Sequence, residues 1–114
     1  MTRVQLTKDS IDLGIVVCDA EKSLAFYRDL LGFEFQGEMP MPGGGTMYRL
    51  LCGTTLLKLV KANEDPARPA GGGITGACGY RYFTISVSNI DEITSACESA
   101  GYTVAVKPRE IRAG

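Results

Sequence analysis

Apolar residues repeat one pattern twice along this chain. In residues 11–18, and again in residues 80–88, apolar side chains recur at alternate positions, which is typical of a β-strand with one buried side. An Asp or Asn follows each stretch, apolar residues then recur at helical spacing, and a Gly before an aromatic residue closes the segment. This repetition predicts a domain of two equivalent modules with a ligand-binding cleft between them.

The first predicted helix starts at Asp19, whose carboxylate can accept hydrogen bonds from the free N–H groups of the first turn. It ends at Gly32, because glycine readily adopts the left-handed conformation that closes helices. Its buried side is predicted from four apolar residues at helical spacing: Leu24, Tyr27, Leu30 and Leu31.

The second predicted helix follows the same plan. Asn89 and Glu92 form an Asn-x-x-Glu variant of the capping box, which indicates a helix start. Gly101 ends the segment, and the buried stripe is predicted from Ile93, Ala96, Cys97 and Ala100.

The remaining apolar stretches predict further strands, with a hairpin turn at Gly53-Thr54. These strands are expected at residues 33–39, 47–52, 55–61 and 102–107.

We therefore expect a single domain, 1–114, with module one at 11–61, a Pro- and Gly-rich connector at 62–79 and module two at 80–114. By analogy with module one, two more strands should follow Gly114. Either the natural chain continues or a partner chain completes the sheet. Because an open sheet edge is a liability, we favour the first explanation.

Charge and composition narrow the function. The 114 residues carry a formal net charge of −1, which gives no basic surface for nucleic acid or anionic lipid. No apolar stretch approaches the ~20 residues that cross a bilayer, and the N-terminus lacks a signal-peptide pattern, so we expect a cytoplasmic protein without a membrane partner. Histidine is absent, which removes the commonest metal ligand and general base.

Strand alternation predicts a candidate site. The apolar members of three strands should face the helices, which leaves Asp12, Lys58 and Tyr82 together on the opposite, concave face. Tyr80 and Thr84 are expected beside them. An acid, an amine and a phenol on one face could bind a polar ligand or transfer protons. The alternative is that Lys58 forms an ion pair with Asp12 and the group is structural.

The segment Asp19–Phe33, with its Phe-Tyr-Arg and Leu-Gly-Phe signatures, closely resembles the first module of the vicinal oxygen chelate superfamily, the group of glyoxalases, bleomycin-resistance proteins and extradiol dioxygenases. Val87, Asn89 and Ala100-Gly101-Tyr102 resemble its repeat. The resemblance implies an α+β fold of paired βαβββ modules, a mixed sheet curved around a cleft, and usually a homodimer.

The resemblance also implies where a metal would bind. Enzymes of the superfamily usually hold a divalent metal with His and Glu side chains from the sheet. In this chain those places carry Asp12, Tyr82 and Lys58, and an ammonium group would repel a cation. We therefore expect no metal ligands and no cofactor, with a divalent metal as the less favoured alternative.

The leading hypothesis is a metal-free small-molecule-binding protein. Lys58 and Arg49 would hold an anionic ligand, whereas a cationic ligand would bind Asp12 and aromatic faces, those of Tyr48, Tyr80 and Tyr82. The alternative is a lyase, isomerase or dioxygenase with an unusual metal shell, or with Lys58 or Tyr82 as the catalytic acid or base. A third hypothesis is a dimeric module whose cleft serves a partner protein or another domain.

Overall fold

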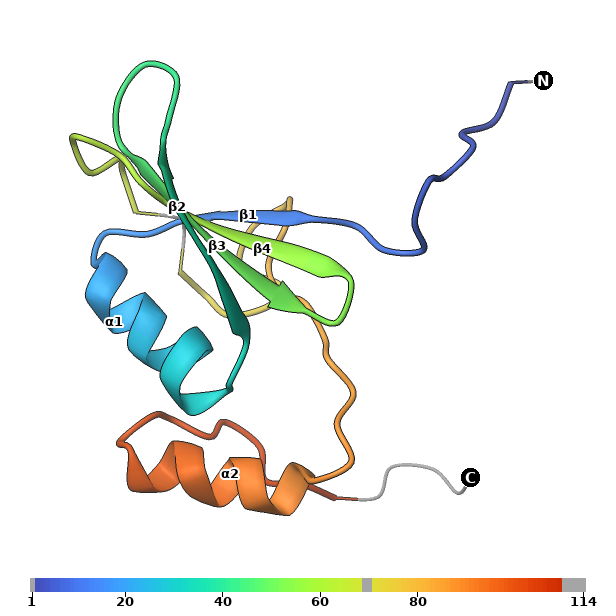
Figure 1. The fold of residues 1–114 in the computed structure, drawn as a ribbon. Helices are drawn as coiled ribbons and strands as arrows, with labels where there is room; N and C mark the ends of the chain where they lie inside the picture. The colour runs from blue at the N-terminus through green and yellow to red at the C-terminus, as the bar shows by residue number, and fades with distance from the viewer. Residues whose placement is uncertain (1, 69–70, 110–114) are drawn as a thin grey trace. The chain divides into compact units, whose positions relative to one another are not determined.

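The protein has an α+β fold in which a mixed four-strand sheet is followed by a second helical segment (Figure 1). The computed structural model describes residues 2–68 and 71–109. The chain divides into two compact units, Met1–Pro66 and Ala67–Gly114, and their boundary falls inside the predicted connector. None of the described helices combines the length and the apolar character that crossing a bilayer requires.

The sheet of the first unit has the strand order β1-β4-β3-β2. β1 runs parallel to β4, and the other neighbouring pairs are antiparallel. Its strands are β1 (Leu13–Val16), β2 (Glu34–Pro40), β3 (Thr46–Cys52) and β4 (Thr55–Lys61).

The hairpin predicted at Gly53-Thr54 is confirmed. Cys52 pairs with Thr55 across the turn, and Gly53 has a φ of +60°, a conformation that glycine adopts without a steric penalty. This local turn joins the two central strands of the sheet, so it fixes the register on which the candidate site depends.

The first predicted helix starts as expected but changes its geometry after one turn. Asp19 accepts a hydrogen bond from the backbone N–H of Lys22, which confirms the cap. The α-helix α1 (Ala20–Leu24) then continues as a π-helix, η1 (Ala25–Leu30), which the apolar spacing did not predict. Gly32, with a φ of +79°, follows the helix as expected.

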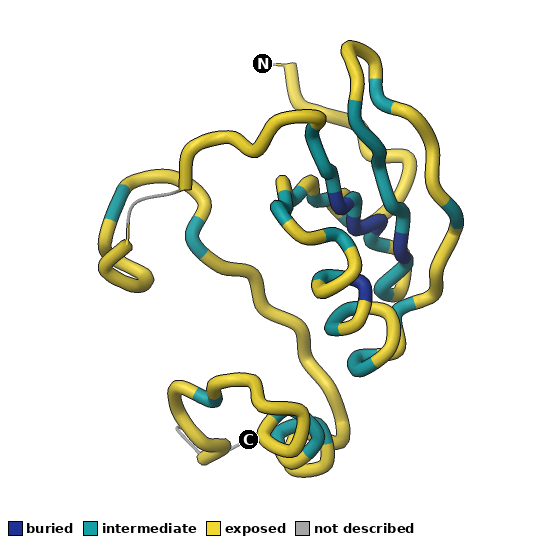
Figure 2. The backbone as a smooth tube through the Cα atoms, turned by 90° about the vertical axis from the view of Figure 1, so that its left-hand side faces the viewer, coloured by how far each residue is buried: buried dark blue, intermediate teal, exposed yellow. Residues whose placement is uncertain are grey.

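The hydrophobic core of the first unit lies between the sheet and its helix, where the buried positions gather in Figure 2. Side chains from α1, β1, β3 and β4 meet there because alternation along each strand turns every second residue toward the helix. The fully enclosed members are leucines, and Leu13, Ile15 and Val17 pack against them as predicted. The buried leucines of this cluster are Leu24, Leu50, Leu57 and Leu59.

In the second unit, helix α2 (Ile90–Ser99) forms where it was predicted, but its start differs. The Asn89 side chain makes no capping bond to the backbone and instead donates to the Glu92 carboxylate, at 3.2 Å. The predicted capping box is therefore replaced by a bond between side chains. The apolar stripe is only partly buried, and Ala100 is exposed.

The two strands predicted in the second unit do not form among the described residues. Residues 80–88 and 102–107 make no sheet ladder. Apolar side chains of the first segment are substantially exposed, with Phe83 at 42% and Val87 at 40%. A strand needs a neighbour to satisfy its backbone N–H and C=O groups, and the described part of this unit offers no sheet for these segments to join.

Candidate functional site

One face of the four-strand sheet packs on α1, and the other, which we call the far face, is turned away from it. Paired residues on neighbouring strands point to the same side of a sheet, so the register assigns residues to this face in transverse rows. Leu13, Leu57 and Leu50 lie in one row on the α1 side, and the next row along the strands lies on the far face.

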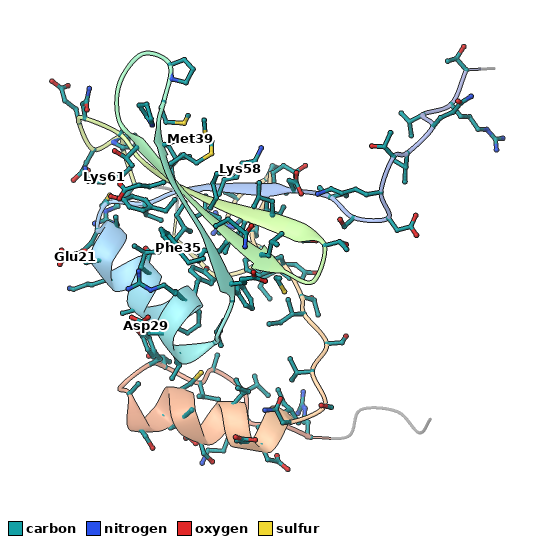
Figure 3. All side chains as sticks on the ribbon, in the orientation of Figure 1. Glu21, Asp29, Phe35, Met39, Lys58 and Lys61 are labelled. Atoms are coloured by element: carbon teal, nitrogen blue, oxygen red, sulfur yellow. The ribbon has the colours of Figure 1, made fainter. Side chains whose placement is uncertain are left out.

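A row of two glycines and two cations crosses the centre of the far face. Gly14 pairs with Lys58, Lys58 with Arg49, and Arg49 with Gly37. In Figure 3, Lys58 projects from the side of the sheet away from α1, whereas Phe35, one row earlier, lies between the sheet and the helix. The structure thus brings the predicted residues Arg49 and Lys58 side by side.

The two cations of this row lack an anionic partner among the described residues. No hydrogen bond or ion pair joins Arg49 or Lys58 to another described side chain, although both are partly buried. Like charges placed directly opposite each other in a sheet are destabilising. The row is therefore a concentration of positive charge that forms no ion pair within these strands, although the Lys58 charge also acts on the Asp12 carboxylate.

The Asp12 carboxylate already has hydrogen-bond partners within the first unit. Its Oδ1 atom accepts hydrogen bonds from the Lys8 ammonium at 2.5 Å and from the Leu56 backbone N–H at 2.9 Å. The Lys8 bond, then the Leu56 N–H and, more weakly, the Lys58 charge hold the pKa of Asp12 below its ordinary value. The alternative in which Asp12 and Lys58 form an ion pair is wrong, because Lys8 takes that place.

Tyr48 lies on the opposite side of the sheet from Arg49. It pairs with Leu59 and packs against the buried leucine cluster on the α1 side. The sheet itself therefore separates it from the two cations, and its contact with a ligand stays a prediction.

Tyr80, Tyr82 and Thr84 lie in the second unit. All three are exposed, with Tyr80 at 99% and Tyr82 at 68%. Tyr82 sits on the segment that was expected to be a strand and forms no ladder. Its predicted meeting with Asp12 and Lys58 on one sheet face stays a prediction.

The sequence interpretation did not single out the two glycines of the central row. A Cβ atom added to Gly14 or Gly37 would meet no atom within 4 Å, so there is open space beside the backbone at each end of the row. Alternation alone places Gly14 on this face. Gly37 reaches it only because the pairing of β2 with β3 shifts between Phe35 and Gly37, an irregularity that no sequence signal announced.

The donor set of the first unit does not fit a divalent metal. Two carboxylates of the described residues lie beside the central row, at opposite edges of the sheet: Asp12, which is engaged by Lys8 and Leu56, and Glu34 on β2. The row between them and the rest of the far face carries the Lys58 ammonium. A cation needs several oxygen, nitrogen or thiolate donors, and a fixed positive charge opposes it. No group of three or more His, Cys, Asp or Glu side chains that could hold a metal gathers in the described residues.

Comparison with known proteins identifies the superfamily of this chain. The model of the glyoxalase/bleomycin resistance protein/dioxygenase superfamily matches residues 9–114. No curated protein matches the sequence.

Three crystal structures show how far the similarity extends. A glyoxalase family protein from Enterococcus faecalis is 25% identical, with a TM-score of 0.67 over 83% of this chain and 74% of the other. One from Bacillus cereus is 19% identical, with a TM-score of 0.70 over 89% and 76%. A lactoylglutathione lyase from Agrobacterium tumefaciens is 22% identical, with a TM-score of 0.56 over 93% and 80%. The last two likenesses show the fold alone.

Proposed function

The chain belongs to the glyoxalase/bleomycin resistance protein/dioxygenase superfamily, and on that premise we propose that it is a metal-free small-molecule-binding protein. The ligand binds on the far face of the sheet, over the row from Gly14 to Gly37. The observation that carries the proposal is that Arg49 and Lys58 lie side by side at the centre of that row and that neither forms an ion pair with a described side chain. Charged groups that are partly withdrawn from water need a partner, and a bound ligand would supply one.

The proposal includes the setting of the protein. We place it in the cytoplasm and expect a homodimer, as is common in this superfamily. The expectation of no metal rests on the donor chemistry around Asp12 and Lys58.

A binding screen tests this function. A small-molecule library with cationic, neutral and anionic members is tested by thermal shift, and binders are confirmed by calorimetry with and without a chelator. We expect at least one ligand whose affinity does not change when the chelator is added. The Gly14→Val variant should lose it, because a branched side chain fills the open space while leaving both cations in place.

Gly14→Val is a safe variant because this glycine does not have a positive φ, and valine favours strands. The matched control is Lys22→Val on the exposed surface of α1, which should bind as wild type does. Absence of any binder, or binding that is indifferent to Gly14→Val, would contradict the proposal.

The second candidate function is catalysis, and one observation favours it. The Lys58 amine makes no ion pair with a described side chain, so it could exchange a proton with a carbonyl substrate, with Tyr82 as the other predicted acid or base. Turnover of methylglyoxal–thiol adducts or of catechols, abolished in Lys58→Ala, would establish it. Inactivity of the wild-type protein across that panel would leave the binding function.

A further inference from the structure

We propose that the ligand class is an amphipathic organic anion, with a carboxylate head on Arg49 and Lys58 and an apolar body on the adjacent row of the far face. This inference rests on the proposed binding function and specifies the chemistry of the same site. It follows from the order of three consecutive rows across the sheet.

The row next to the cations is entirely apolar. It lies two residues from the cation row on each strand, which places it roughly 6–7 Å away. Val16 is 58% exposed and Met39 is 46% exposed, so the two ends of the row present apolar surface to water. The row consists of Val16, Val60, Met47 and Met39.

Methionine is suited to contact irregular ligands, because its unbranched thioether side chain adapts to different shapes. Met47 and Met39 are directly paired across β2 and β3. Neighbouring strands lie about 4.8 Å apart, so an apolar body about the width of an aromatic ring would cover two adjacent side chains of this row, such as the methionine pair. The favourable free energy of burying this apolar surface would then add to that of the charge interaction.

The head group is specified by the cations. The Arg49 guanidinium has a planar set of donors that matches a carboxylate in a bidentate way, and the Lys58 ammonium adds a point charge beside it. A carboxylate between them would offset one of the two positive charges that face each other across the strands and would so reduce their repulsion. Gly14 and Gly37 leave room for the head at both ends of the row.

The row on the other side of the cations determines the direction in which the apolar body of the ligand extends. Acidic residues stand at its ends, because Asp12 precedes Gly14 by two residues and Glu34 pairs with Leu51. The Glu34 charge, which forms no ion pair with a described side chain, opposes a second anionic group there, whereas the Asp12 charge is offset by Lys8. The ligand is therefore a single anion whose body extends toward the methionines, and not a dicarboxylate that spans both rows.

Three matched probes test the inference: 4-butylbenzoate, the neutral 4-butylbenzamide and the cationic 4-butylbenzylammonium, each titrated by calorimetry at neutral pH. We expect the benzoate to bind the wild-type protein at least tenfold more tightly than the amide. Arg49→Gln and Lys58→Gln should each weaken benzoate binding by about 10- to 100-fold, the usual effect of losing a charged hydrogen bond. Neither should change the affinity for the amide. Lys22→Gln on α1 is the control and should bind as wild type does.

A second measurement guards against unfolded variants. Because each glutamine substitution removes one of two facing like charges, the ligand-free variants should melt at the wild-type temperature or slightly above it. Equal binding of benzoate and amide, or benzoate binding that ignores both substitutions, overturns the inference.

Failure of the inference can be separated from failure of the proposed function. If the library yields only neutral or cationic ligands that Gly14→Val abolishes, the binding function stands and the anionic class is wrong. If no ligand of any charge responds to Gly14→Val, both are wrong.

Discussion

The chain carries a strand-then-helix pattern twice, and the two copies have different outcomes in the structure. In the first, β1 pairs with β4 and buries its alternate residues against the core. In the second, residues 80–88 form no ladder and Ile85 is 39% exposed. The helices form in both copies.

The difference teaches that helices and strands depend on different parts of the sequence. A helix satisfies its own backbone hydrogen bonds, so a local sequence pattern is enough to place it, even for α2, whose Asn89 side chain makes no capping bond. The backbone N–H and C=O groups of a strand must pair with another strand, which is often far away in the sequence. The first copy has the β3–β4 hairpin to pair with, whereas the described part of the second unit contains no strand.

The largest expected effect comes from matched substitutions in the two copies. Leu59→Ala empties a fully buried position and should reduce the free energy of unfolding by about 2–5 kcal/mol. Ile85→Ala, at an exposed position of the second copy, should reduce it by less than about 1 kcal/mol. Urea denaturation followed by circular dichroism measures both. Similar losses in the two variants would mean that residues 80–88 are packed in solution and would remove the contrast.

A smaller effect is expected at the helix starts. Asp19→Ala should cost about 1 kcal/mol, because the carboxylate caps the backbone N–H of Lys22. Asn89→Ala should cost less, since the Asn89 side chain bonds only to the Glu92 side chain and leaves the backbone uncapped. The same denaturation experiment compares them. A larger loss for Asn89→Ala would show that a capping box forms in solution.

The smallest effect concerns Asp12, whose carboxylate just before β1 accepts hydrogen bonds from Lys8 and from the Leu56 backbone N–H. Because the pKa of Asp12 is held below its ordinary value, the contribution of this carboxylate to stability is complete above the unfolded pKa of about 3.9. It is lost as the pH falls through the lower pKa of the folded state. Asp12→Asn should therefore melt below wild type at neutral pH, and the difference should shrink under acid conditions.

The control for this experiment is Asp9→Asn in the same N-terminal segment, where no hydrogen bond or ion pair to a described residue is found. It should follow wild type at every pH. A melting difference for Asp12→Asn that persists unchanged in acid would contradict the proposed role of the carboxylate charge.

Much of the first unit could be predicted from its sequence. The alternation of residues 11–18 and 55–61 identified which side chains reach the core, and the hairpin and the Asp19 cap follow from local chemistry. The π-helix η1 could not be predicted, because the spacing of apolar residues does not distinguish it from an α-helix.

The candidate site was only partly predictable. Alternation placed Lys58 on the face away from the helix. It could not predict that Arg49 lies directly beside Lys58, or that Lys8 forms an ion pair with Asp12. Those facts depend on the register between strands and on a contact with the N-terminal segment, which local sequence does not encode.

The sequence by itself determined where helices start and end, which residues turn toward the core, and the superfamily signature in residues 19–33, because each depends on near neighbours along the chain. Only the tertiary structure decided which strands pair, how the shift after Phe35 carries Gly37 and Met39 to the far face, and which charges stand together there. The physical reason is that a β-ladder consists of hydrogen bonds between segments that are far apart in the sequence. Its register is set by the packing of the whole sheet, and no single strand contains that information.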